Sequence, residues 1–258
     1  MTLITRRALI SRGALVGGAA ATGGMLLSGC DRLAENEQFR QILFSGEKIN
    51  YHLQRLVVDR NALAPEFRPD QMSPRFRANG TANPGTPEYG RMVAENFANW
   101  RLKIGGLVTK PAELSLPQLR SIPARTQITR HDCVEGWSAI GKWQGPTLKS
   151  LLQLAAVKPE ARYVLFTCAD LYGGKPYYET IDMTDALHPQ TILAWAMNDR
   201  VLDVGHGAPV RLRVERQLGY KHAKYVMAID AVPSLSGIGL GKGGYWEDRI
   251  DYDWFAGI

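Results

Sequence analysis

Short segments of alternating apolar and polar residues dominate the chain from position 100 onward. Residues 100–104 alternate as a half-buried strand does, and residues 163–167 form the apolar run of a buried strand. Further extended segments are expected at 126–133, 210–214 and 225–229. Residues 192–197 and 201–202 are expected to form a hairpin around the turn pair Asn198 and Asp199. In this part of the chain helical spacing is found at 115–122 and 147–156. Because the strands outnumber the helices and do not alternate regularly with them, the sequence predicts an α+β fold with mixed sheets.

Length and composition exclude several classes of protein. The chain has 258 residues, of which 45% are hydrophobic and 22% charged, a balance typical of a globular protein that can bury a core. A wholly disordered, fibrous or polytopic membrane protein is therefore excluded. The formal net charge of +6 would by itself be compatible with an anionic partner such as nucleic acid.

The first thirty residues have the layout of an export signal. Residues 1–12 contain three arginines and no acidic residue, and the apolar run that follows is short for a bilayer span. The pair Arg6 and Arg7 resembles a twin-arginine signal, which carries proteins that are already folded. The run ends in Leu-Ser-Gly before Cys30, which resembles a lipobox with Cys30 as the lipidated residue. The alternative is a plain signal peptide with an incidental cysteine.

Removal of this segment would lower the net charge of the chain. The three arginines at positions 6, 7 and 12 account for half of the +6 balance, so the chain without them carries +3. The remaining cations of interest gather around Arg211 and Lys224. A nucleic-acid partner is therefore not needed to explain the composition, and none is expected.

The predicted organisation has three parts. Residues 1–30 form the signal, and residues 31–95, which are polar and interrupted by proline and glycine, are expected to be an irregular N-terminal segment that wraps around the body. An amphipathic helix is plausible near residues 37–43. Residues 96–258 are expected to form one domain, with no internal repeat.

The densest group of reactive residue types surrounds Cys133. Residues 130–138 read Arg-His-Asp-Cys-Val-Glu-Gly-Trp-Ser, and Arg130 and His131 would favour the thiolate, which ligates metals or attacks carbon. Three alternatives stay open on this pattern alone. Cys133 could pack as a small buried hydrophobe, or belong to a zinc site, which would need more ligands nearby. It could also be the nucleophile of a Cys–His hydrolase.

Two glycine-containing turns offer cations to a bound anion. They lie at 206–211 and 219–224 and supply two histidines, an arginine and two lysines, namely His206, Arg211, Lys221, His222 and Lys224. Arginine is suited to bidentate phosphate binding and lysine to charge neutralisation. The alternative is a pair of solvated hairpin loops.

The glycine-rich stretch at 237–244 contains a superficial G-x-G-x-G pattern. It follows Pro233 and Ser234 and does not open a helix after a strand, so a dinucleotide-binding turn is excluded and a surface turn is expected. The aromatic residues that come next are expected to dock the C-terminus onto the body: Trp246, Tyr252, Trp254 and Phe255.

The segment around Cys133, followed by Trp143-x-Gly145 and Leu148, resembles the signature around the molybdenum-ligating cysteine of the sulfite oxidase superfamily. Further pieces resemble the same family in the expected order, at 100–107, 186–189, 197–198, 206–211 and 219–221. The resemblance spans about residues 75–258. It is closer to the bacterial periplasmic branch, which includes the methionine sulfoxide reductase catalytic subunit, than to animal sulfite oxidases.

The resemblance implies a mixed-sheet α+β domain at 96–258 that binds one mononuclear molybdenum centre on one molybdopterin. It makes Cys133 the catalytic protein thiolate on the metal, and a soft thiolate suits such a centre. The implied cofactor contacts are Phe76, Arg77 and Asn79 at one pterin end, Thr167 or Cys168, His206 and Arg211, and the loop of His222, Ala223 and Lys224. His206 stands where the reductase branch has asparagine.

The implied activity is two-electron oxygen-atom transfer to or from a small-molecule or protein-bound sulfur compound. One alternative is methionine sulfoxide reduction in periplasmic protein repair, and another is a lipoprotein that binds an anion or a protein without redox chemistry.

The chain has no C-x-x-C-H haem-attachment motif, so no haem is expected on it. Electrons would be exchanged with a membrane haem b protein or a cytochrome c. Asp31 after Cys30 further suggests a periplasmic location, held by the lipid at the outer face of the inner membrane.

Overall fold

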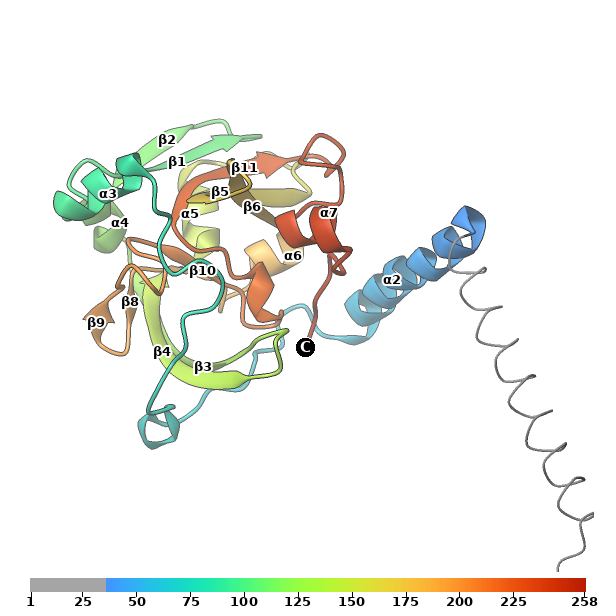
Figure 1. The fold of residues 1–258 in the computed structure, drawn as a ribbon, viewed down its shortest axis with the longest axis horizontal. Helices are drawn as coiled ribbons and strands as arrows, with labels where there is room; N and C mark the ends of the chain where they lie inside the picture. The colour runs from blue at the N-terminus through green and yellow to red at the C-terminus, as the bar shows by residue number, and fades with distance from the viewer. Residues whose placement is uncertain (1–35) are drawn as a thin grey trace, which may run out of the picture. The chain divides into compact units, whose positions relative to one another are not determined.

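The computed structural model describes residues 36–258, and it divides at Val57 and Val58 into two compact units (Figure 1). Arg6, Arg7 and Cys30, on which the export and lipidation predictions rest, lie outside the described residues. In the described range no helix combines the length and the apolar character needed to cross a membrane.

The described part of the first unit is one helix, α2 (Glu37–Val57). Its apolar residues Ile42, Ile49, Leu53 and Leu56 recur at spacings of seven, four and three, so they share one face. The helix is three times as long as the stretch expected at 37–43. Its later turns continue the apolar face, but charged residues stand between the apolar ones along the sequence.

The second unit is built on a five-stranded sheet in the order β2-β1-β11-β5-β6. Its strands are β1 (Arg101–Gly106), β2 (Ala112–Ser115), β5 (Tyr163–Tyr172), β6 (Lys175–Asp182) and β11 (Val226–Val232). Strands β1 and β11 run parallel and all other neighbours run antiparallel. The sheet is therefore mixed, as the sequence predicts.

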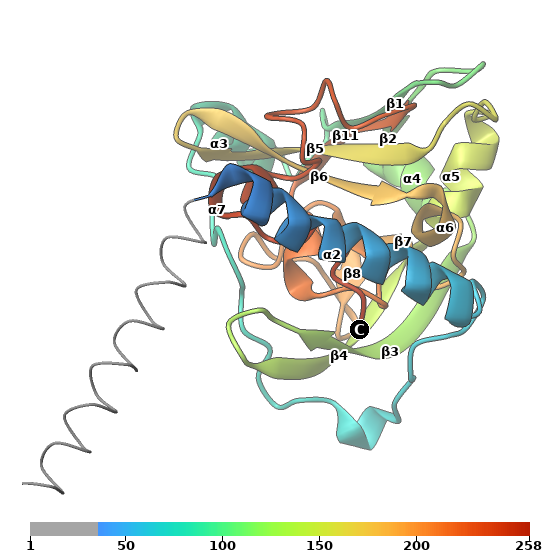
Figure 2. The same cartoon turned by 90° about the vertical axis from the view of Figure 1, so that its right-hand side faces the viewer.

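Two smaller sheets complete the unit. One has four strands in the order β3-β4-β8-β9, and the other pairs β10 with β7. Their bounds are β3 (Ala124–Asp132), β4 (Ser138–Pro146), β7 (Ile192–Ala194), β8 (Ala196–Met197), β9 (Arg200–Val201) and β10 (Arg211–Arg213). In Figures 1 and 2 the five-stranded sheet lies on one side of the unit and the β3–β4 hairpin on the other, with β7 and β8 between them.

Short helices and 3-10 turns connect these strands. They are α3 (Pro87–Ala94), α4 (Leu116–Ser121), α5 (Leu148–Leu154), α6 (Met183–Ala186), α7 (Tyr245–Ile250), η1 (Pro69–Gln71) and η2 (Gly219–Lys221). Helix α4 begins as predicted at Ser115, whose hydroxyl accepts from the Gln118 amide while the Gln118 side chain returns to the Ser115 backbone. Thr147 caps α5 in the same way, by accepting from the Ser150 amide.

The hairpin expected across 192–202 forms only in part. Strand β7 pairs with β10, whereas β8 pairs with β4 and β9, so the chain changes sheet at Trp195. The predicted turn at Asn198 and Asp199 is confirmed, because both residues adopt positive φ between β8 and β9.

The range 31–95 contains the helices α2 and α3 and, between them, residues 58–86 with little regular structure. This connection is held to the β3–β4 hairpin by backbone hydrogen bonds from Phe67 to Ile128 and from Ser73 to Ile140. The division of the chain at positions 30 and 95 stays a prediction.

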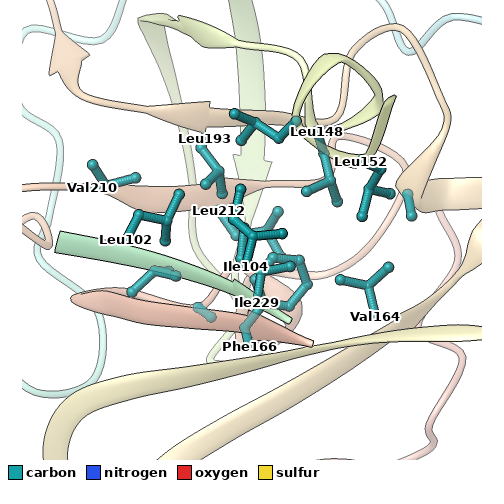
Figure 3. Packing of buried hydrophobic residues seen from close by; sticks show 14 of the residues in the cluster. Leu102, Ile104, Leu148, Leu152, Val164, Phe166, Leu193, Val210, Leu212 and Ile229 are labelled. Atoms are coloured by element: carbon teal, nitrogen blue, oxygen red, sulfur yellow. The ribbon is translucent and has the colours of Figure 1, made fainter. Parts of the chain in front are cut away.

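The main core lies between the five-stranded sheet, the β7–β10 pair and α5, as Figure 3 shows. Leu102 and Ile104 of β1, Phe166 of β5 and Leu212 of β10 are fully or almost fully buried there, and α5 contributes Leu148, Leu151 and Leu152. A second cluster around Phe76 and Trp143 fills the space beside the β3–β4 hairpin. The two clusters make the second unit a rigid support for the loops described below.

Helix α5 offers a matched pair of leucines for testing this core. Leu151 has 0% of its surface exposed and Leu154 has 49%. We expect Leu151→Ala to lower the free energy of unfolding by about 2–5 kcal/mol, because it leaves a cavity, and Leu154→Ala to change it by no more than about 0.5 kcal/mol. Urea denaturation followed by circular dichroism measures both. Equal losses would contradict the packing of α5.

Candidate active site

Cys133 lies in the loop that closes the long β3–β4 hairpin. The two strands pair without interruption from Ala124 opposite Pro146 to Asp132 opposite Ser138. The Cys133 amide then donates to the Trp137 carbonyl at 2.9 Å, and the Gly136 amide donates to the Cys133 carbonyl at 3.0 Å. Gly136 has a φ of 83°, which a glycine adopts without strain. The hairpin thus presents a half-buried thiol at a defined point.

The charged neighbours of Cys133 do not act as the sequence suggests. Arg130 donates through Nε to Asp132 Oδ2 at 2.9 Å, and Asp132 Oδ1 accepts from Ser138 Oγ at 2.5 Å. Burial raises the pKa of the Cys133 thiol, against a backbone hydrogen bond from Glu135 that lowers it. The expectation that Arg130 and His131 stabilise the thiolate is therefore wrong, since Arg130 pairs with Asp132 and alternation along β3 buries His131 elsewhere.

His131 belongs to a buried chain of polar groups behind the hairpin. Its Nδ1 lies 2.9 Å from Arg213 Nη1 and must accept, because a guanidinium only donates. Arg213 also donates to both carboxylate oxygens of Glu215, and Gln127 Nε2 donates to Glu215 Oε1 at 2.8 Å. Burial and the nearby Arg213 hold the pKa of His131 well below its usual range. His131 is therefore neutral and links β3 to β10.

Cys133 opens into a cavity with about 720 Å³ of non-protein space, part of which is open to solvent. The polar residues of its wall are Asn79, Thr81, Asp170, His222 and Lys224. Its aromatic residues are Tyr172, Tyr177, Tyr220, Trp246 and Tyr252. Gly80, Val134, Glu135 and Gly219 complete the wall.

Asp170 reaches the cavity because β5 is irregular at this point. The pairing of β5 with β6 shifts register between Thr167 and Leu171, and such a bulge redirects side chains. Asp170 is buried, and its burial raises the pKa of the carboxyl to about 6. Asp170 is the one acidic residue in the sequence of β5, which could have marked it as a functional residue, but the sequence analysis does not include it among the site residues.

Lys224 lines the buried side of the same cavity. Its Nζ donates to the carbonyls of Thr81 at 2.5 Å and of Gly205 at 2.9 Å. Burial, together with the nearby Arg211, lowers the pKa of Lys224 to about 7. Arg211 is fully buried and donates to the carbonyls of His206 at 3.1 Å and His222 at 3.5 Å. Both cations are therefore held by backbone carbonyls.

The sequence-predicted residues divide into two groups in space. Cys133, Asn79, His222 and Lys224 line the cavity. The others do not: Phe76, Arg77, Thr167, Cys168, His206, Arg211 and Ala223. Arg211 lies behind the wall through its bond to His222, and His206 is held by Asp203 and the Phe76 carbonyl. Thr81 and the aromatic wall were not assigned to the site from sequence, because only folding brings 79–81, 172–177 and 246–252 together.

Comparison with known proteins places this site in a family. Residues 89–236 match the model described as an oxidoreductase molybdopterin binding domain. The chain is 38% identical over 232 residues, which cover 90% of it and 82% of the relative, to an Azospira oryzae protein named "Putative protein-methionine-sulfoxide reductase subunit YedZ1".

A Campylobacter jejuni protein-methionine-sulfoxide reductase catalytic subunit, MsrP, is 34% identical over 152 residues, which cover 54% of this chain and 51% of that protein. The chain thus spans about half the length of this MsrP relative. In a comparison of structures, the sulfane dehydrogenase SoxCD of Paracoccus pantotrophus is similar to this chain with a TM-score of 0.49 and 24% sequence identity. The similar region covers 53% of this chain and 39% of the SoxCD chain.

The chain belongs to the oxidoreductase molybdopterin-binding family. It is a molybdopterin-dependent oxidoreductase with the mixed-sheet α+β domain expected for the sulfite oxidase type, as the resemblance around Cys133 implies. Membership in this family also sets aside the alternatives of a zinc site, a Cys–His hydrolase and a binding protein without redox chemistry.

The residues at the cavity fit a molybdopterin. Three of its buried wall atoms, Asn79 Oδ1, Asp170 Oδ1 and His222 Nδ1, have no hydrogen-bond partner among residues 36–258. Buried polar atoms normally have partners, and a pterin offers both donors and acceptors. In the same range no ion pair joins Lys224 to a carboxylate within 4.0 Å, so this cation of the cavity wall fits a phosphate.

A second buried cation, Lys221, fixes the loop that carries this wall. Its Nζ donates to Glu179 Oε1 of β6 at 2.5 Å and to Glu247 Oε1 of α7 at 2.6 Å, and all three side chains are fully buried. Burial and the neighbouring Glu247 raise the pKa of Glu179 well above its usual range. The group therefore joins η2, β6 and α7 beside the cavity.

Removal of Lys221 tests this arrangement. We expect Lys221→Ala to lower the free energy of unfolding by about 3–5 kcal/mol, because it leaves two carboxyl groups buried without a cation. Lys242 pairs with Asp251 at the surface, so Lys242→Ala is the control and should cost less than about 1 kcal/mol. Chemical denaturation measures both values. Similar losses for the two variants would show that Lys221 does not carry a buried ionic group.

Proposed function

We propose that this protein reduces methionine sulfoxide. The overall reaction consumes the sulfoxide, two electrons and two protons and yields the thioether and water. One relative, from Campylobacter jejuni, is named a protein-methionine-sulfoxide reductase catalytic subunit, and another, from Azospira oryzae, is named a putative subunit of such a reductase. They support the reductase alternative over the general assignment of oxygen-atom transfer on an unspecified sulfur compound.

The observation that carries the proposal is the charge of the cavity wall. Among residues 36–258, Lys224 is the one lysine or arginine in that wall, and it lies on the buried side with its Nζ bonded to two carbonyls. The exposed side of the wall holds Glu135 and aromatic rings instead. A dianion such as sulfite would find a carboxylate there, whereas a neutral sulfoxide meets no repulsion.

Each part of the wall then has a role. Cys133 would hold the molybdenum, and the bound centre supplies two-electron exchange with the sulfur compound. Lys224, which lines the cavity, would bind the cofactor phosphate. Arg211, behind the wall, would hold the His222 carbonyl in place. Asn79, Asp170 and His222 would bind the polar edges of the pterin through their unpartnered atoms. His206 would act indirectly, by holding the Phe76 carbonyl and the Arg211 side chain in place.

Enzyme assays on the molybdenum-loaded protein test the proposal. With reduced viologen as the electron donor we expect turnover of methionine sulfoxide, and with ferricyanide as the acceptor we expect little or no oxidation of sulfite. Rapid sulfite oxidation without sulfoxide reduction would overturn the proposal and favour the opposite direction of catalysis.

The variant Cys133→Ser tests the role of the thiol. We expect it to retain its fold, because Cys133 is half-buried at a loop, and to lose methionine sulfoxide reduction by at least about a hundredfold, or about 2.7 kcal/mol in the activation barrier. Elemental analysis and circular dichroism accompany the assay. Leu154→Ala is the control, and unchanged turnover in Cys133→Ser would exclude the thiol as a metal ligand.

We further propose that the enzyme works in the periplasm, exported folded through Arg6 and Arg7 and anchored by a lipid on Cys30. Its electrons would come from a membrane haem b protein or a cytochrome c, and it would carry no haem itself.

Cell fractionation tests the anchor, because Cys30→Ser should move the protein from the membrane fraction to the soluble periplasmic fraction. Arg6→Lys together with Arg7→Lys should keep it in the cytoplasm. A Cys30→Ser protein that stays with the membrane would refute the lipid anchor.

A further inference from the structure

We propose that four aromatic side chains at the mouth of the cavity, Tyr172, Tyr220, Trp246 and Tyr252, bind the methionine sulfoxide side chain of a polypeptide. We call these four residues the aromatic rim. The inference rests on the proposed reduction of methionine sulfoxide and names the part of the chain that selects a protein-bound substrate. Two rim residues, Trp246 and Tyr252, come from the C-terminal segment, beyond the end of the family match at residue 236.

Burial separates the cavity into an inner and an outer part. The inner wall includes Asp170, His222 and Lys224, together with Tyr177, all of them buried. The four rim residues are half-buried, and Val134 and Glu135 next to Cys133 are exposed. The polar inner wall therefore suits the cofactor, and the rim is the part of the cavity that an incoming side chain meets first.

The rim is one connected group of rings together with the buried Tyr245. Tyr172 contacts Trp246 at 5.4 Å between ring centroids and Tyr245 at 5.0 Å. Trp246 lies 6.4 Å from Tyr252, which packs on Tyr220 at 4.9 Å. Rings that hold one another at such distances stay in place without a ligand. A substrate side chain would thus meet a surface that is already formed, and little conformational entropy would be lost on binding.

The C-terminal segment is anchored on both sides of the rim. Glu247, next to Trp246 on α7, is bonded to Lys221 of η2. Tyr220 donates from its hydroxyl to the Asp253 carbonyl at 2.6 Å, beside Tyr252. Trp254 Nε1 donates to Thr180 Oγ1 of β6 at 2.8 Å. These bonds hold Trp246 and Tyr252 over the cavity more firmly than docking of the aromatic residues alone would do.

The chemistry of the rim matches a methionine sulfoxide side chain. Its methyl and methylene groups are apolar and pack on aromatic faces, and divalent sulfur of the product also makes favourable contacts with aromatic rings. Among the described residues that line the cavity, Lys224 on the buried side is the one lysine or arginine, and Glu135 belongs to the same wall as the rim. Because the rim residues are partly exposed to solvent, a substrate side chain can contact them while the rest of its polypeptide remains outside.

Kinetics of the molybdenum-loaded enzyme with a peptide that contains methionine sulfoxide test the proposal. We expect Trp246→Ala and Tyr252→Ala each to raise the KM for the peptide about tenfold, the usual scale for an aromatic binding residue. We expect kcat at saturating peptide, and at saturating dimethyl sulfoxide, to stay within about twofold. Trp246→Phe should recover most of the affinity. Ile250→Ala, in the same segment but exposed and outside the cavity wall, is the control and should match the wild type.

A binding measurement gives a readout apart from turnover. A fluorescent peptide that contains methionine sulfone, which is not reduced, should bind the wild type and bind Trp246→Ala about tenfold more weakly by anisotropy. Equal affinity in the two proteins, or loss of molybdenum and pterin from Trp246→Ala, would overturn the inference, since the second result would show that the rim holds the cofactor. Failure of the wild type to reduce any sulfoxide would instead overturn the proposed function.

Discussion

Four cations buried within fourteen residues of chain are the constraint on which the rest of the site depends. Arg211, Arg213 and Lys221 have 0% of their surface exposed and Lys224 has 6%. A buried charge is costly unless it is paired. Arg213 is paired with Glu215, and Lys221 with two glutamates. Arg211 and Lys224 are bonded to backbone carbonyls instead, and of the two Lys224 lines the cavity.

These pairings also decide where the walls of the cavity stand. The Arg213–His131 contact joins β10 to the hairpin that carries Cys133, and the Lys221 group joins η2 to β6 and α7. The thiol, the inner polar wall and the aromatic rim are thus connected through the same buried residues. A substitution at one of these buried residues should therefore change the position of side chains in the other walls. Stability and substrate binding are for this reason measured separately in each variant.

Several elements were predictable because their signals are local. The caps at Ser115 and Thr147, the turn at Asn198 and Asp199 and the strand that becomes β1 each depend on residues within a few positions of one another. Other elements depend on distant partners. The chain leaves one sheet for another at Trp195, and the bulge in β5 that turns Asp170 toward the cavity is a register shift against β6. No window of sequence shows either event.

The sequence by itself determined the class of protein, since the run around Cys133 and the ordered motifs at 206–211 and 219–224 carry the family resemblance. It also determined the α+β composition of the fold through its periodicity. The tertiary structure decided which charges face Cys133: it paired Arg130 with Asp132, turned His131 to Arg213, and brought Asp170 and the C-terminal aromatic residues to one cavity. The physical reason is that strand alternation and buried pairing assign each side chain to a face, and both are set by residues far away in the chain.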